Sequence, residues 1–269
     1  MRHGGLHPRP RSDLLAERQP RRRRSPVRMA TTNDYQARMK TYKHIFFDLD
    51  RTLWDFDAAA EVAFEKIYEK YHLKDLGIPS AHDFHTVYHP LNEKLWALYR
   101  INAITKEHLR RERFMEPLAH YGIHDPDLAD QLSNDYVYFS PRIVRLFPGT
   151  MEILEYLHPE YQLHLITNGF QEIQEIKLKE SGMGKYFTSM TVSEEISVKK
   201  PSPEIFLYAM QKAKARVEQS IMIGDEMEVD IDGARNIGMD QIYFNPKRIP
   251  HEEPSTYEIN SLLQIVDIL

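Results

Sequence analysis

Two acidic side chains follow directly on an apolar run in the segment HIFFDLDRTLW (44–54). The carboxylates of Asp48 and Asp50 are one residue apart, so they repel each other unless a cation or a proton comes between them. An unpaired carboxylate in apolar surroundings also costs several kcal/mol or gives up its charge. Either a positively charged group binds at this point, or the run is not a buried strand.

Short apolar runs rich in β-branched residues recur along the chain and predict strands. They occupy residues 43–47, 161–167, 188–192, 220–225 and 241–244. Helical patterns lie between them, at 171–182 with a stop at Gly182, at 202–213 and at 230–238. Strands that alternate with helices form parallel crossover units, so we expect an α/β fold in which helices cover both faces of a doubly wound parallel sheet.

The interval from about residue 56 to residue 142 breaks this rhythm. Its segments 57–71 and 90–122 carry apolar residues at helical spacing, and no clear strand pattern occurs in it. We therefore expect an all-helical insertion between the first strand and the rest of the sheet.

Chemistry-bearing residues follow several of the predicted strands. Asp48 and Asp50 follow the first one. Thr167 and Asn168 end the second, and Asp225 ends a later one. Ligands bind at the carboxyl ends of the strands in a parallel sheet, so these residues should meet along one edge. Three acids in one cleft indicate a hard divalent cation, and Mg²⁺ suits best because it binds a few carboxylates together with water and substrate phosphate.

Two further residue types complete the chemistry of the predicted cleft. Lys200, in the segment KKPSPEIF, adds a positive charge that could neutralise a nucleophilic carboxylate and a phosphate. The Thr167 hydroxyl and the backbone amides after Asn168, that of Gly169 first, could donate to phosphate oxygens. A nucleophilic Asp, an acid/base Asp two residues on, Mg²⁺, a Lys and a Thr form a complete set for phosphoryl transfer through an aspartyl-phosphate.

Four ordered segments, DLDRT, ITNG, KKPSPEIF and GDEMEVDIDGARNIGM, resemble the motifs of the haloacid dehalogenase-like (HAD) hydrolases. The resemblance covers about residues 43–246, and the insertion lies where that superfamily carries a helical C1 cap. The resemblance therefore implies a Rossmann-like core made of residues 41–55 and 143–269, with a helical cap at 56–142.

The family pattern implies a role for each matching residue. Asp48 would be the nucleophile, and Asp50 the general acid and then the general base. Thr167, with Asn168 and Gly169, would bind the transferring phosphoryl group.

The same pattern implies how charge is balanced. Lys200, the Lys before Pro, would stabilise the phosphoryl charge, with Lys199 the less suitable partner. Mg²⁺ would be held by Asp48, by the backbone carbonyl of Asp50, and by Asp225. Asp230 would act on the metal through water, or would simply cap the helix that follows it.

Asp50 also bears on the subtype, because haloacid dehalogenases proper lack this acid; their halide leaves without a proton. A phosphatase is therefore favoured over a dehalogenase. Arg51 stands where most relatives have Gly, and the segments DLDRTLWDF and 91–114 are similar to the pyrimidine 5′-nucleotidases of the group. This likeness predicts a nucleoside monophosphatase with a pyrimidine preference, whose cap would contact the substrate through Asn92, Trp96 and Arg113.

Other interpretations remain open from the sequence. A sugar-phosphate or phosphoglycolate phosphatase, or a phosphomutase, would use the same core, and a non-catalytic phosphate- or partner-binding protein could retain the fold. Trp96 could belong to the hydrophobic core of the insertion instead of the substrate site. A zinc site could use the spacings of three histidines, although no Cys or further clustered ligand completes it: His82, His85 and His89.

Composition and charge limit the kinds of partner and metal site that the protein can have. The chain has 269 residues, 42% of them hydrophobic, and no Cys, so disulfides and thiolate metal sites are excluded. Outside residues 1–28 it carries 26 basic and 38 acidic residues, a net charge of −12, which disfavours nucleic acid as a partner. Neither a secretory pattern nor a membrane-spanning apolar run occurs. We expect a cytoplasmic protein that acts on a small-molecule phosphate ester, as a monomer or a homodimer.

Residues 1–28 form an Arg-rich leader with nine Arg and two acids, a net charge of +7. They lack a hydrophobic period, so we expect them to be disordered. The leader could be a nuclear-localisation or nucleic-acid patch, an organelle transit peptide, or a stretch upstream of a true start at Met29.

Overall fold

The computed structural model describes Met1 and residues 42–269 of the chain. The rest of the predicted leader, and the expectation that it is disordered, lie outside the described residues. Within the described part, no helix is long and apolar enough to cross a membrane.

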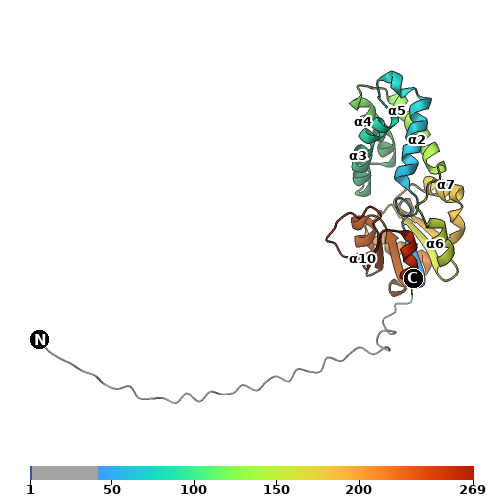
Figure 1. The fold of residues 1–269 in the computed structure, drawn as a ribbon, viewed down its shortest axis with the longest axis vertical. Helices are drawn as coiled ribbons and strands as arrows, with labels where there is room; N and C mark the ends of the chain where they lie inside the picture. Colours follow the sequence, from blue (N-terminus) through green and yellow to red (C-terminus); the bar gives the residue numbers. More distant parts are fainter. Residues whose placement is uncertain (2–41) are drawn as a thin grey trace, which may run out of the picture. The chain divides into compact units, whose positions relative to one another are not determined.

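A parallel sheet forms the core of the half of the described part that is drawn below in Figure 1. Its six strands are His44–Phe47 (β1), Gln162–Thr167 (β2), Phe187–Val192 (β3), Ser220–Gly224 (β4), Asp240–Phe244 (β5) and Tyr257–Ile259 (β6). They lie in the order β3-β2-β1-β4-β5-β6, and every neighbouring pair is parallel. The predicted α/β fold with a Rossmann-like core is confirmed. The predicted strands match β1 to β5, whereas the three residues of β6 are too few and too polar to form an apolar pattern.

The helices of the described part fall into two groups along the chain. Between β1 and β2 lie Phe56–Lys70 (α2), Ala81–Arg100 (α3), Lys106–His120 (α4), Pro126–Phe139 (α5) and Thr150–Leu157 (α6). After β2 come Gln171–Ser181 (α7), Ser193–Ile196 (α8), Pro203–Ala213 (α9) and Asp232–Asn236 (α10). A π-helical turn, Met227–Ile231, precedes α10, so the helix predicted at 230–238 is shorter than expected.

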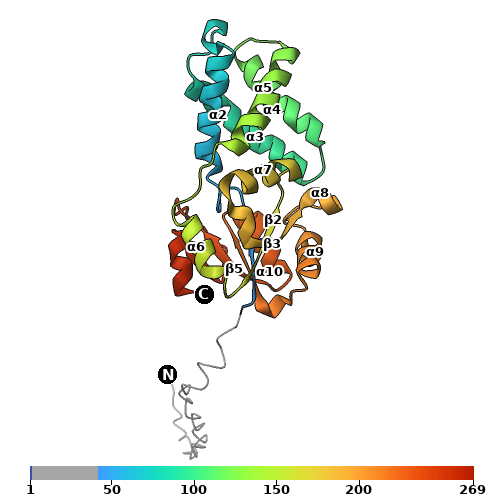
Figure 2. The same cartoon turned by 90° about the vertical axis from the view of Figure 1, so that its right-hand side faces the viewer.

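Successive residues of β1 face opposite sides of the sheet, and helices cover both sides (Figure 2). Ile45 and Phe47 pack in one hydrophobic cluster with α6 and with Leu178 of α7. Phe46 packs in another with α9 and α10. The polar backbone of β1 is paired on both edges, with β2 and β4. A strand whose last three residues are apolar is thereby buried on both faces, and its carboxyl end directs the following acids to the edge of the sheet.

The helices α2 to α5 enclose a hydrophobic cluster of their own (Figure 1). Phe64 makes ring contacts there with Phe84, Phe114 and Tyr136. Each of the four helices begins after a side chain that accepts a hydrogen bond from its first turn: Asp55, Ser80, Thr105 and Asp125. Residues 56–142 therefore contain helices and, among the described residues, no strand. We call this stretch the helical insertion.

Candidate functional site

One cavity lies at the carboxyl ends of β1, β2 and β4, and α3 of the helical insertion contributes part of its wall. It is lined by most of the residues that the sequence predicts for a site: Asp48, Asp50, Asn92, Trp96, Thr167, Asn168, Gly169, Lys200, Asp225 and Asp230. Arg113 lines a neighbouring cavity instead. Within the described part of the chain, no metal-binding group is formed by the three histidines of α3, His82, His85 and His89.

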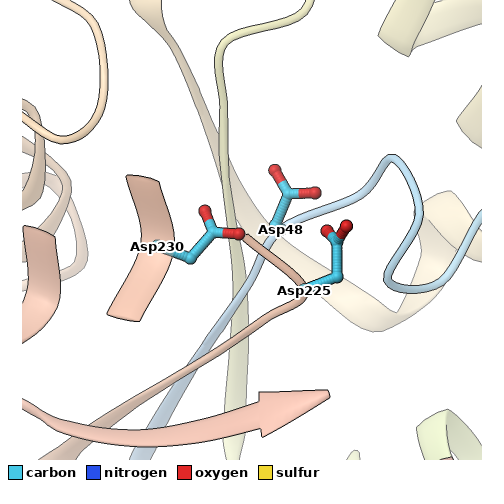
Figure 3. A group of neighbouring side chains, drawn as sticks. All are labelled: Asp48, Asp225 and Asp230. Atoms are coloured by element: carbon cyan, nitrogen blue, oxygen red, sulfur yellow. The ribbon is translucent and has the colours of Figure 1, made fainter. Parts of the chain in front are cut away.

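Three carboxylates meet in this cavity (Figure 3). Asp48 follows β1, Asp225 follows β4, and Asp230 belongs to the π-helical turn. One carboxylate oxygen of each lies within 4.8 Å of the other two. The approach of Asp230 requires Gly224, because a Cβ at that position would lie 2.4 Å from the Cβ of Asp230. This triad offers only oxygen ligands, which are those that Mg²⁺ prefers.

Burial raises the pKa of two of these carboxyls. The pKa of Asp48 is raised to about 7, mainly by burial, while Lys200 acts in the opposite direction. The pKa of Asp225 is raised well above its ordinary value by burial and by the negative charges of Asp230 and Asp48. A bound divalent cation would offset both the burial of these charges and their repulsion, so the electrostatics of the triad fit a metal site.

Lys200 provides the positive charge within this group. Its buried Nζ lies 2.5 Å from Asp48 Oδ1 and 2.6 Å from Asp230 Oδ1. Burial alone would lower the pKa of Lys200, but the two carboxylates raise it above its ordinary value. Lys199 lies elsewhere, with its Nζ 2.5 Å from Asn102 Oδ1. The structure thus places Lys200, and not its neighbour, beside Asp48.

The loop after β2 holds its polar groups through internal hydrogen bonds. Thr167 Oγ1 accepts from the Gly169 amide at 3.0 Å and from Gln174 Nε2 at 2.9 Å, so its own hydroxyl hydrogen remains available to donate. The Asn168 side chain is occupied by the backbone of Lys200, whose amide and carbonyl it binds at 2.8 and 3.0 Å. The Thr167 hydroxyl is therefore free to donate to a phosphate, and the side chain of Asn168 instead positions Lys200.

Three side chains outside the predicted set donate hydrogen bonds to carboxylates of the site. Gln174 and Lys177, one turn apart on α7, both donate to Asp50: Gln174 Nε2 lies 2.8 Å from Oδ2, and Lys177 Nζ contacts Oδ1. Thr52 donates to Asp225 Oδ1 at 3.0 Å. Thr52 could have been found in the DLDRT segment. The two residues of α7 carry no comparable signal, because only the direction of that helix turns them towards Asp50.

The helical insertion brings aromatic and amide groups to the cavity. Trp96 stacks on Phe170 of the loop after β2, with ring centroids 5.2 Å apart. Its neighbours in the hydrophobic cluster include Leu95 and Tyr99, so Trp96 is both a packing residue and part of the cavity wall. Asn92 is buried and accepts a hydrogen bond from Tyr88 at 3.1 Å, while also lining the cavity.

Comparisons with known proteins agree with this geometry. The pyrimidine 5′-nucleotidase PynA of Streptococcus pneumoniae is 32% identical over 232 residues, which are 85% of this chain and 95% of that protein. A glyceraldehyde 3-phosphate phosphatase of Pyrococcus furiosus is 30% identical over 237 residues, covering 86% of this chain and 94% of that one.

A crystal structure of the HAD-hydrolase YfnB of Bacillus subtilis, bound to magnesium, superposes with a TM-score of 0.76 and 28% identity, over 85% of this chain and 98% of that one. The family model of the haloacid dehalogenase-like hydrolases matches residues 45–244, which run from the second residue of β1 to the end of β5 and include all of the residues in the cavity. The chain belongs to the haloacid dehalogenase-like hydrolase family.

Proposed function

We propose that this protein is a Mg²⁺-dependent phosphomonoester hydrolase that acts through an aspartyl-phosphate, with pyrimidine nucleoside 5′-monophosphates as its preferred substrates. The observation that carries the proposal is the buried group in which Lys200 Nζ joins Asp48 and Asp230, next to Asp225. This group combines a nucleophilic carboxylate, a cation and a candidate metal site in one cavity.

The donor set supports Mg²⁺ as the metal. The carboxylates of Asp48 and Asp225 and the backbone carbonyl of Asp50 would hold the ion, and Asp230 would contact it through water. Mg²⁺ supplies charge neutralisation for the carboxylates and the substrate phosphate. Lys200, together with the charge of an ion held by these residues, would offset the negative charge of a phosphate beside Asp48.

The residues of the chain support a two-step reaction. In the first step an oxygen of Asp48 forms a bond to phosphorus, the ester P–O bond breaks, and the leaving oxygen takes a proton from Asp50. In the second step a water molecule attacks the phosphorus and gives a proton to Asp50. The bond between phosphorus and Asp48 then breaks, and inorganic phosphate leaves. The Thr167 hydroxyl and Lys200 would bind the phosphoryl oxygens in both steps.

Two observations support a nucleotide as substrate. The relative from Streptococcus pneumoniae carries the name of a pyrimidine 5′-nucleotidase. Trp96 lines the cavity, and its ring stacks on Phe170, which lines the neighbouring cavity. A second candidate function is a sugar-phosphate phosphatase, which is supported by the relative named a glyceraldehyde 3-phosphate phosphatase. We propose in addition that residues 56–142 act as a cap, because a closed lid excludes water and lets contacts remote from phosphorus contribute to rate.

A substrate panel under saturating Mg²⁺ tests the proposal. We expect kcat/KM for CMP and UMP to exceed that for hexose phosphates, phosphoglycolate and glyceraldehyde 3-phosphate by at least about tenfold, which is about 1.4 kcal/mol of transition-state binding. Asp48→Asn should show no turnover with any ester, which controls for contaminating phosphatases. A panel led by sugar phosphates would replace the nucleotidase with the second candidate. No turnover with any ester would overturn the hydrolase proposal as a whole.

A further inference from the structure

A second cavity adjoins the proposed catalytic cavity and has no role in the reaction as described above. The two share four lining residues, Asp50, Phe56, Trp96 and Gly169. Beyond these the second cavity extends to α4 and α5 of the helical insertion, where Arg113 and Tyr136 line it. A group attached to a phosphate in the first cavity could therefore extend past Asp50 into the second.

Arg113 is a buried cation whose donors are not all used. Arg113 is only 4% exposed, and both its Nε and its Nη2 are buried without a hydrogen-bond partner. Among the described residues, no carboxylate forms an ion pair with it. An unpaired buried charge is costly, so folded proteins normally provide it with a partner. The Nε and Nη2 atoms form one edge of the guanidinium, which presents two parallel N–H donors to a pair of adjacent acceptors.

Tyr136 adds a third unused donor next to this edge. Its ring centroid lies 4.9 Å from Cζ of Arg113. Its buried hydroxyl makes no hydrogen bond of ordinary geometry, and its nearest polar neighbour is the hydroxyl of Tyr88, which itself donates to Asn92. Burial raises the pKa of Tyr136 well above its ordinary value, so the hydroxyl keeps its proton. The guanidinium lies in cation–π contact with this ring, while its Nε and Nη2 make no hydrogen bond. Two buried residues on different helices, both lining the second cavity, thus carry donors without a hydrogen-bond partner.

Aromatic rings make up a large part of the remaining wall of this cavity, beside aliphatic residues and the polar groups of Asp50, Gln174 and Lys177, which bind one another. Trp54, Phe56, Trp96 and Phe170 line it, and Trp96 and Phe170 stack on each other. Such a wall favours a flat ring over a compact anion, because ring faces bury apolar area while a carboxylate or phosphate would lose its water without gain from them. A ligand that satisfies both parts of the cavity is a planar ring with hydrogen-bond acceptors on one edge.

We propose that Arg113 and Tyr136 recognise the base of the substrate by donating hydrogen bonds to the acceptor edge of a pyrimidine, O2 and N3 in cytosine or a carbonyl oxygen in uracil. This inference rests on the proposed function, since the base is the part of a nucleoside monophosphate remote from phosphorus. A site built to hydrogen-bond a substrate group discriminates strongly against analogues that lack it, because its buried donors are then left unpaired.

The test compares CMP with ribose 5-phosphate, which carries the same sugar phosphate and lacks the base. In the wild-type protein with Mg²⁺, kcat/KM for CMP should exceed that for ribose 5-phosphate by at least about tenfold. Tyr136→Phe, which removes one oxygen atom, and Arg113→Lys, which keeps the charge and loses the paired donors, should each reduce this ratio by about tenfold or more. Arg111→Lys and Tyr138→Phe, at exposed positions of α4 and α5, are the matched controls and should leave the ratio unchanged.

Binding of the base can be measured apart from turnover. Cytidine, which has no phosphate, should inhibit ribose 5-phosphate hydrolysis by the wild-type protein and should do so about tenfold more weakly in Tyr136→Phe. If the wild-type ratio is high and neither variant lowers it, the base is read elsewhere and this inference is wrong while the proposed function stands. A wild-type ratio near one overturns both. Phosphoglycolate turnover that depends on Arg113 more than CMP turnover does would assign the residue to an anion and overturn the inference.

Discussion

Arg51 joins the loop after β1 to the helical insertion: its Nη2 lies 2.9 Å from Glu93 Oε1 on α3, and its Nε lies 3.0 Å from Asp57 Oδ1 on α2. The backbone of Arg51 has a φ of +63°, in the left-handed region that favours glycine. An L-residue pays about 1 kcal/mol or more for this conformation. The side chain offsets that strain by connecting the residue next to Asp50 with two helices of the insertion.

Substitution of Arg51 separates the strain from the contacts. Arg51→Ala keeps the strained backbone and removes the ion pairs, whereas Arg51→Gly removes both. The glycine variant should therefore be more stable than the alanine variant. Its free energy of unfolding, measured by urea denaturation, should be about 1 kcal/mol higher. Both variants should raise KM for the preferred nucleotide, because the ion pair between Arg51 and Glu93 no longer connects the loop after β1 to α3. Equal stability of the two variants would show that the conformation carries no strain.

Asp50→Asn tests the proposed acid/base role. The substitution keeps the size of the side chain and an oxygen acceptor, but it removes the proton that the leaving group needs. Turnover should fall by about 10²–10⁴-fold, the usual contribution of a general acid or base. Mg²⁺ binding, measured by calorimetry, should persist because the proposed ligand is the backbone carbonyl of this residue. Near-normal turnover would move the acid/base role to another group.

Lys177 should act on catalysis through Asp50 alone. It is buried on α7 and its Nζ contacts Asp50 Oδ1. Lys177→Gln should lower kcat by about tenfold with little change in KM, because Asp50 loses one of the two partners that orient it. In an Asp50→Asn background the same substitution should have little further effect, since residues that act as a unit are not additive. An effect of equal size in both backgrounds would indicate a general structural role for Lys177.

How far the sequence predicts this site depends on where each residue lies. Asp48, Thr167 and Asp225 sit at the ends of apolar strands, so the strand pattern and the rule for parallel sheets are enough to bring them together. Gln174 and Lys177 reach Asp50 only because of the direction of α7. The unpaired donors of Arg113 and Tyr136 likewise depend on how α4 packs against α5, and no local pattern in the sequence encodes that packing.

A pair of histidines in the sheet should make stability depend on pH. His164 of β2 is fully buried, with Nε2 3.1 Å from His44 Nδ1 and Nδ1 2.8 Å from Ser189 Oγ. Burial lowers the pKa of His164 from 6.5 to about 4. Between those two pH values the unfolded chain binds a proton that the folded chain does not, so the unfolding free energy should fall as pH decreases from 6.5 to 4.

For a pKa shift of this size, the unfolding free energy should fall by about 3 kcal/mol across this pH range. Other groups also titrate in this range, and buried Asp48 acts in the opposite sense because its pKa is raised. The measurement is therefore the difference between the wild-type protein and His164→Gln in urea denaturation across this range. The variant should lose less stability on acidification. Parallel curves for the two proteins would show that His164 binds its proton equally in the folded and unfolded chain.

Asp225→Asn should have opposite effects with and without metal. In a chelator, the substitution removes one of three clustered carboxylates whose charges repel, so the variant should melt at a higher temperature than the wild-type protein. Mg²⁺ that binds only the folded protein should raise the free energy of unfolding of the wild-type protein. The increase is about 2.7 kcal/mol when the Mg²⁺ concentration is 100 times the dissociation constant. The variant lacks one proposed ligand and should gain much less stability at the same Mg²⁺ concentration.

Melting curves of both proteins in chelator and across a Mg²⁺ titration measure these changes. If the two proteins gain equally, Asp225 is not a ligand, and the triad binds its metal through other atoms or not at all.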